Sequence, residues 1–119
     1  MELKILAVNH QKIAEVIANG VVINNAQDAL DMMVNAGYLD AQSVIMNEKH
    51  LDNSFFDLRS GLAGEILQKY VNYKMKLAIM GDFEKYQSDS LNAFIVECNR
   101  GNQIFFVSDR ETAINKLTG

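Results

Sequence analysis

The chain has 119 residues and a formal net charge of −4, and hydrophobic residues make up 49% of it. This size and balance predict one globular domain over residues 1–119. No apolar run approaches the roughly 20 residues that a membrane span needs, and the start lacks the basic-then-apolar order of a signal peptide. Lys and Arg are scattered without a basic stripe, which argues against nucleic-acid binding. The single cysteine, Cys98, excludes an internal disulfide and favours a reducing compartment, so we expect a cytoplasmic protein.

The first part of the chain predicts a hairpin and a helix. Residues 3–8 and 12–18 are short and rich in Ile and Val, as strands are, and the polar break between them predicts an antiparallel pair. Apolar residues then recur at helical spacing over residues 25–36. Asn24 or Asn25 suits the start of this helix, and Gly37 suits its end.

The rest of the chain alternates between strands and helices. Helices are predicted over residues 60–72 and 88–100, and Ser108 and Glu111 have the spacing of a capping box that opens a last helix. Because such alternation requires crossover connections, the strands should be parallel. The predicted fold class is α/β, a mixed sheet with an N-terminal antiparallel hairpin followed by alternating helices and parallel strands. Continuous apolar runs mark the later strands at residues 43–47, 76–80 and 103–107.

The most informative segment runs over residues 53–69, from a loop into a helix. It places Asp57, Ser60 and Gly61 at the helix start, where small polar residues and glycine leave backbone N–H groups open to an anion. We therefore predict a phosphorylation or anion site at Ser60 and Gly61. The alternative is that Ser60 is a plain N-cap. Gly61 and Gly64 are expected to serve either close packing of the helix on the sheet or the approach of a partner.

This segment also carries a resemblance to known families. The order of hairpin, helix and three strand–helix units is similar to that of the STAS domain of bacterial anti-sigma-factor antagonists, whose Asp-Ser-Ser-Gly-Leu-like motif contains a phosphorylated serine. Residues 56–62, Phe-Asp-Leu-Arg-Ser-Gly-Leu, look similar, with Ser60 and Gly61 on the second serine and the glycine of that motif. Asp57 lies one residue farther from this serine than in the motif, and Arg59 replaces the first serine.

A second resemblance is closer and extends over nearly the whole chain. Residues 55–69, Phe-Phe-Asp-Leu-Arg-Ser-Gly-Leu-Ala-Gly-Glu-Ile-Leu-Gln-Lys, together with Gly81-Asp82-Phe83, resemble a family of small bacterial proteins catalogued as a domain of unknown function, family 4180. The resemblance implies a STAS-like fold and carries no established activity.

Acidic residues follow several predicted strands. The carboxyl ends of parallel strands are the usual binding edge of such sheets, and converging carboxylates there can hold Mg²⁺. A small-molecule or Mg-dependent site at this edge is therefore the enzyme alternative. No metal-ligand spacing, nucleophile elbow, phosphate-binding loop or dinucleotide fingerprint is present, so we expect no catalytic residue, cofactor or metal. The acids concerned are Glu48, Asp52, Asp57, Asp82 and Asp109.

Apolar residues raise the question of a contact surface. Phe55, Phe56 and Phe83 flank the marked loop, either as a hydrophobic cluster that pins it or as an exposed patch for a partner. Met32 and Met33 are adjacent on the first helix, so one of them pointing outward would mark a second contact surface.

These features favour a non-enzymatic regulatory or protein-interaction module with Ser60 as a phosphorylation-controlled switch. The expected partner is a protein, or a second copy of the chain in a homodimer, and neither nucleic acid nor a membrane. A purely self-associating subunit is a further alternative. The hypothesis requires an exposed Ser60 at a helix start beside the carboxyl edge of parallel strands. The expected partner surface consists of Phe56, Asp57, Arg59, Asp82 and Phe83.

Overall fold

A single five-stranded sheet, in the order β1-β2-β3-β4-β5, organises the computed structural model, which describes residues 1–119. The hairpin of β1 (Glu2–Val8) and β2 (Gln11–Ile17) is antiparallel. The remaining strands join β2 in parallel, which confirms the predicted α/β class with an N-terminal hairpin on a mixed sheet. These parallel strands are β3 (Ser43–Asn47), β4 (Lys76–Met80) and β5 (Ile104–Val107).

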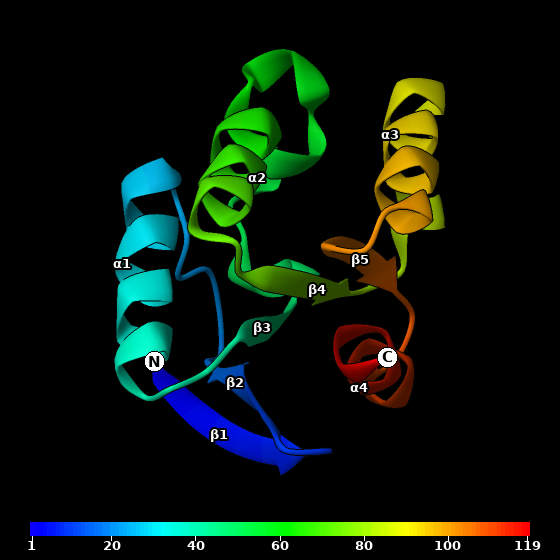
Figure 1. Ribbon diagram of the computed structural model, residues 1–119. Helices are drawn as coiled ribbons and strands as arrows, with labels where there is room; N and C mark the ends of the chain where they lie inside the picture. The colour runs from blue at the N-terminus through cyan, green and yellow to red at the C-terminus, as the bar shows by residue number, and fades with distance from the viewer.

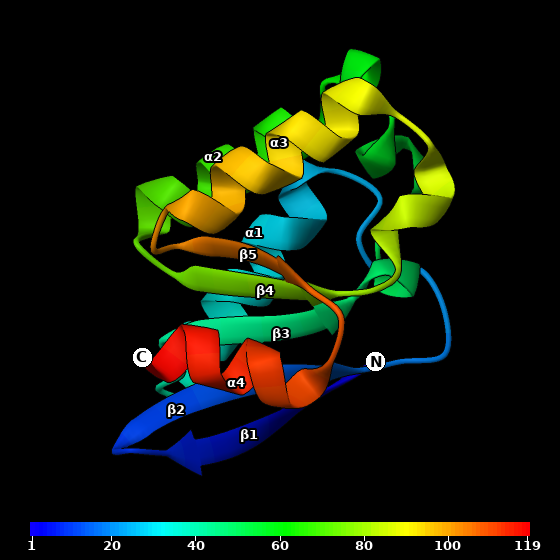
Figure 2. The same cartoon turned by 90° about the vertical axis from the view of Figure 1, so that its right-hand side faces the viewer.

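Helices cover both faces of the sheet (Figure 1). Figure 2 shows α1 (Ala26–Tyr38), α2 (Leu62–Tyr73) and α3 (Asp89–Arg100) together on one face, and α4 (Arg110–Thr118) on the other. Two-sided coverage explains why the parallel strands are continuous apolar runs. None of the four helices has the length and apolar content needed to cross a bilayer.

Short 3₁₀ turns lie at the carboxyl edge of the parallel strands. η1 (Glu48–His50), η2 (Asn53–Phe56) and η3 (Leu58–Ser60) follow β3 and lead into α2. η4 (Phe83–Tyr86) follows β4 and leads toward α3. The sequence pattern predicted a loop and helix here, and it did not predict these turns.

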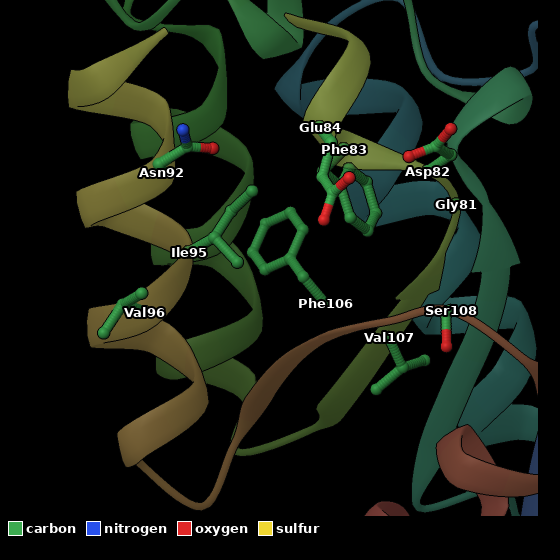
Figure 3. A pocket seen from close by; sticks show the side chains of 10 residues that line it. All are labelled: Gly81, Asp82, Phe83, Glu84, Asn92, Ile95, Val96, Phe106, Val107 and Ser108. Atoms are coloured by element: carbon green, nitrogen blue, oxygen red, sulfur yellow. The ribbon is translucent and has the colours of Figure 1, made fainter. Parts of the chain in front are cut away.

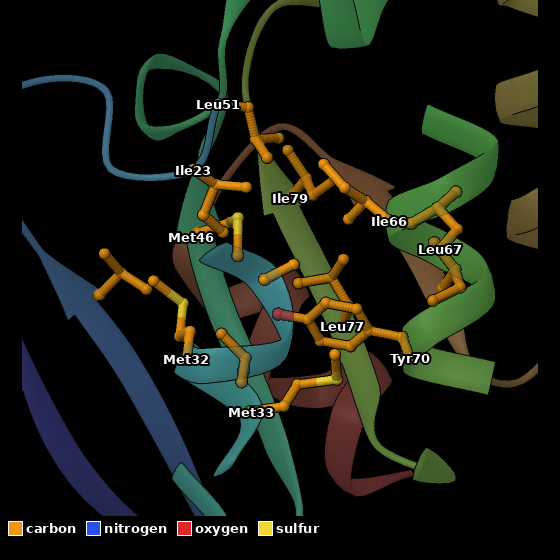
Figure 4. Close-up of a cluster of buried hydrophobic side chains, with 14 of the residues drawn as sticks. Ile23, Met32, Met33, Met46, Leu51, Ile66, Leu67, Tyr70, Leu77 and Ile79 are labelled. Carbon is orange, nitrogen blue, oxygen red and sulfur yellow. The ribbon is translucent and has the colours of Figure 1, made fainter. Parts of the chain in front are cut away.

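The larger hydrophobic core lies between the sheet and the α1–α3 layer (Figure 4). Met32 and Met33 are both buried in it, with 3% and 1% of their surfaces exposed. The expectation of an outward-facing methionine and a second contact surface is therefore wrong. The physical reason is that α1 packs against α2 as well as the sheet, so adjacent positions both meet apolar neighbours. The flexible thioether side chains suit such a site.

Helix ends agree with the sequence in part. Asn25 caps α1 by accepting a hydrogen bond from the Asp28 N–H at 2.8 Å, as expected. The predicted stop at Gly37 is wrong, because α1 continues past it and the chain turns at Asp40, in the left-handed region at φ 66°. The predicted capping box at residues 108–111 is also wrong. Asp109 caps α4 instead, because its carboxylate accepts from the amide of Thr112 at 2.7 Å.

Candidate functional site

Ser60 lies on the surface at the end of η3, directly before α2. Its hydroxyl donates a hydrogen bond to the Ser54 carbonyl at 2.6 Å. The same oxygen accepts from the N–H of Leu62, the first residue of α2, at 3.1 Å. The N-cap of α2 is Gly61, so the prediction of Ser60 as a plain N-cap is wrong by one residue, although its oxygen still accepts from the first turn of the helix. The hydroxyl also closes the turn over η2 and η3. Ser60 is thus exposed directly before a helix, and the principal contacts of its turn η3 are with η2 and α2.

Gly61 has a conformational role, and Gly64 has none. Gly61 adopts φ 79°, in the left-handed region that L-residues rarely enter, and forms the corner between η3 and α2. A Cβ placed on either glycine would have no neighbouring atom within 4 Å. The expectation that these glycines serve close packing on the sheet is therefore wrong.

Asp57 and Arg59 form an exposed ion pair beside Ser60. The Asp57 carboxylate accepts from the Arg59 backbone N–H and from its Nε, both at 3.2 Å. These hydrogen bonds to Arg59 lower the pKa of Asp57. Because the Arg59 side chain is 93% exposed, the pair contributes little to stability and its guanidinium is accessible to another anion.

An aromatic cluster fixes this loop to η4. Phe56 stacks on Tyr86 with ring centroids 4.7 Å apart, and its centroid lies 6.1 Å from that of Phe83. Phe55 is fully buried, and Phe56 is only 6% exposed. The cluster interpretation is confirmed, and the placement of Phe56 on an exposed partner surface is wrong. Phe56 instead supports that surface from below, because stacking on η4 removes it from solvent.

Glu48 anchors η4 from the end of β3. Its carboxylate is largely buried and accepts hydrogen bonds from Lys85 Nζ and, at 3.0 Å, from the Tyr86 hydroxyl. Burial, followed by the hydrogen bond and the charge of Glu48, raises the pKa of Tyr86. Any Cβ at Gly81 would lie 2.7 Å from Glu48 Cδ, so glycine at 81 leaves the space that this anchor occupies.

The strand-end acids do not converge on a metal site. No group of three or more His, Cys, Asp or Glu residues has an arrangement that could hold a metal ion. Glu48 binds η4, Asp52 accepts from both the amide and the hydroxyl of Ser54, and Asp109 caps α4. The structure therefore uses these acids as turn and cap residues, while Asp82 stays on the surface.

The two histidines and the cysteine lie in three different parts of the fold. His10 is exposed in the hairpin turn, whereas His50 is 4% exposed. The Nδ1 of His50 accepts from the Asn47 amide at 3.0 Å, and its Nε2 lies 3.0 Å from the Ala18 carbonyl. Cys98 is half-buried against the larger core, as expected for a small hydrophobic residue, and burial raises the pKa of its thiol.

A groove of about 680 Å³ opens at the same carboxyl edge, between η4, α3 and β5 (Figure 3). Figure 3 shows the Phe106 ring and the Ile95 side chain pointing toward each other across its floor. Asp82 and Glu84 stand at the η4 side of the groove. The sequence had indicated Asp82 and Phe83 as surface residues, and the structure adds the α3 and β5 residues that complete the hollow.

A known protein family matches nearly the whole chain. The model described as "Domain of unknown function (DUF4180)" matches residues 8–117. The chain belongs to this family. The match includes the Ser60 loop, the groove, α1 to α3 and α4 up to Leu117, and it confirms the family resemblance that residues 55–69 indicated. No curated protein and no solved structure gives a significant match to the chain.

The DUF4180 region also contains polar contacts that sequence reasoning missed. Arg110, at the start of α4, binds the Glu15 carboxylate on β2 through Nε at 2.8 Å and a terminal nitrogen at 3.2 Å. Asn99 on α3 accepts from the Phe106 amide at 2.8 Å and donates to the Phe106 carbonyl at 3.1 Å. Both pairs join different elements, so no local sequence pattern could predict them.

Proposed function

We propose that this DUF4180 protein is a non-enzymatic interaction module with a STAS-like fold, regulated at Ser60 and acting in a bacterial cytoplasm. Its order of hairpin, helix and three strand–helix units is the order of STAS domains, which supports the fold assignment. The position of the Ser60 hydroxyl is the observation that carries the regulatory part. It is on an exposed residue, yet it holds η2, η3 and α2 together.

Phosphorylation would change this junction directly. A kinase would form a bond between Ser60 Oγ and the terminal phosphorus of a nucleoside triphosphate, as the nucleoside diphosphate leaves and the hydroxyl proton is released. The modified oxygen would no longer donate to the Ser54 carbonyl. The phosphate would add roughly −1.5 to −2 charges at neutral pH.

The phosphate would then interact with the charged groups around Ser60. The start of α2 favours an anion by about 0.3–1 kcal/mol at an exposed position. Asp57 would repel the phosphate, whereas Arg59 would be drawn from Asp57 toward it. The modification is therefore expected to move the loop that carries both residues.

The proposed partner surface comprises Asp57, Arg59, Ser60, Asp82 and Phe83. Phe56 joins its two halves, because it comes from the Ser60 loop and stacks on η4. A change at Ser60 would thus be transmitted to η4 through packed rings. This coupling favours a regulated protein-binding surface over a rigid structural subunit.

Phosphopeptide mass spectrometry of the protein purified from its native cells tests the switch. We expect phosphate on Ser60 in at least one growth condition and none at Ser90, an exposed serine at the start of α3 that serves as an internal control. Nuclear magnetic resonance spectra of Ser60→Glu should show amide shifts in residues 54–62 and 83–86. Asn115→Glu is the control, because Asn115 is exposed on α4, on the opposite face of the sheet, and it should leave these residues unchanged. Absence of phosphate at Ser60 in all conditions tested would contradict regulation at this serine.

A further inference from the structure

The groove between η4, α3 and β5 shares Asp82 and Phe83 with the proposed partner surface, and the rest of its lining includes residues of α3 and β5. Its floor is apolar, formed mainly by Phe83, Ile95, Val96 and Phe106. Its volume of about 680 Å³ falls within the ~300–1,000 Å³ of typical ligand pockets. The space is therefore large enough for more than one side chain.

The charge of the groove has one sign. Asp82 and Glu84 line it, and no Lys, Arg or His does. Neither carboxylate takes part in any ion pair of this chain, unlike Glu48, whose charge is met by Lys85. A positively charged ligand would give these two acids a partner without breaking an existing bridge.

The floor is held in place before any ligand arrives. The Phe106 ring meets Phe83 edge-on at 5.3 Å and Phe94 at 6.2 Å between centroids. The Phe106 backbone is held by both ends of the Asn99 carboxamide. A preformed floor reduces the ordering that binding would otherwise require.

We propose that this groove binds a segment of a partner protein in which a Lys or Arg side chain neighbours an apolar side chain. The apolar side chain would lie on Phe106, Ile95 and Val96, and the cation would pair with Asp82 and Glu84. Aromatic faces also attract such cations. Asn92 and Ser108, at the sides of the groove, provide polar groups for the backbone of the segment. The assignment rests on the proposed role as an interaction module and names the chemistry of its partner.

Selection of random peptides displayed on phage against the full chain tests the assignment. We expect the selected peptides to contain Lys or Arg beside an apolar residue and to bind more weakly as salt is added. Asp82→Asn and Glu84→Gln should each weaken binding up to about fivefold, as for an exposed ion pair. Glu97→Gln is the charge control, because Glu97 is an exposed acid on α3 that already pairs with Arg100.

A matched pair of valines tests the apolar floor. Val96 is 50% exposed in the groove, and Val34 is 51% exposed on α1. Val96→Ser should weaken peptide binding, and Val34→Ser should not. Circular dichroism of each variant at the assay temperature confirms that it is folded.

Three results would overturn the assignment. One is selection of acidic or uncharged peptides, and another is binding that the Asp82, Glu84 and Val96 variants leave unchanged. The third is a dimer in light scattering that these peptides dissociate, since a second copy would then occupy the groove. Peptides that respond to Ser60→Glu and not to the groove variants would overturn the groove and leave the proposed regulatory surface standing.

Discussion

At the scale of single residues, Gly61 and Gly64 lie in one segment, but only Gly61 has a backbone conformation that requires glycine. Gly61 turns the chain in a left-handed conformation, and Gly64 lies in regular helix with open space around it. A Cβ is therefore strained at 61 and harmless at 64. Replacing Gly64 with a less flexible residue should therefore stabilise α2.

Alanine substitution at the two positions should have opposite effects on stability. Gly64→Ala should raise the free energy of unfolding by up to about 1 kcal/mol, because alanine is the better helix former. Gly61→Ala should lower it by about 1–2 kcal/mol, because φ 79° disfavours an L-residue. Urea denaturation followed by circular dichroism measures both. A loss of stability in Gly64→Ala would show that this glycine is required by something the packing does not reveal.

At the scale of elements, the edge strand β5 depends on a side chain from α3. In a parallel sheet, alternate backbone groups of an edge strand face outward without a neighbour. At Phe106 the Asn99 carboxamide takes the place of that neighbour, donating to the carbonyl and accepting from the amide. α3 is thereby fastened to β5 at a point that also forms the floor of the groove.

Removing this side chain should loosen both elements. Asn99→Ala should lower the free energy of unfolding by about 1–3 kcal/mol, because two part-buried backbone groups lose their partner. Asn99→Asp should also destabilise, since a carboxylate accepts from the amide but repels the carbonyl. Asn92→Ala, on the exposed surface of the same helix, should have little effect. Equal stability of Asn99→Ala and wild type in urea denaturation would contradict the role of Asn99.

The contact made by Asn99 also shows what the sequence alone could predict. Periodicity and turn residues located the hairpin, the helices and the parallel strands, because those signals are local. The turn η4 could not be predicted locally, because Glu48 from the end of β3 holds it. The turns η1, η2 and η3 begin at local caps, which are too short a signal to distinguish a 3₁₀ turn from an ordinary loop. These caps are Asn47, Asp52 and Asp57. The capping box at 108–111 failed for a local reason: Asp109 competes one residue later for the same role.

In the candidate site, too, residues with a local environment could be predicted from the sequence, and residues with distant partners could not. Ser60 and Gly61 could be located from sequence because their environment is the start of the following helix. The burial of Phe56 could not, because its stacking partner Tyr86 lies on a different element. The groove required three elements to be placed together before it existed as a feature.

At the scale of the whole molecule, His50 joins three separate parts of the chain. Its ring connects β3, through the Asn47 amide, to the residue that follows β2, through the Ala18 carbonyl. Its own carbonyl accepts from the amides of Val22 and Ile23, on the connection that leads to α1. Because Nδ1 accepts a hydrogen bond from the Asn47 amide while Nε2–H donates one to the Ala18 carbonyl, this network requires the neutral ring.

The pH dependence of stability should therefore contain a contribution from His50. Burial lowers the pKa of His50 from the ordinary 6.5, the nearby Lys49 charge lowers it further, and the hydrogen bond to Ala18 opposes both. Since the unfolded chain binds this proton more readily, the contribution is complete above pH 6.5 and is lost as the pH falls from there toward the folded pKa. The free energy of unfolding should fall by at most about 1.4 kcal/mol per pH unit in this window.

Urea denaturation between pH 7.5 and 5 measures this slope, in wild type and in two variants. His50→Gln should flatten it, because glutamine can still accept from the Asn47 amide, as in a capping box, but does not titrate. His10→Asn is the control, since His10 is exposed and asparagine tolerates its left-handed backbone at φ 65°. The acids with lowered pKa values, Asp52, Asp57 and Asp109, titrate below 3.8 and do not contribute here. A slope that persists in His50→Gln and disappears in His10→Asn would place the titrating group in the hairpin turn and contradict the role of His50.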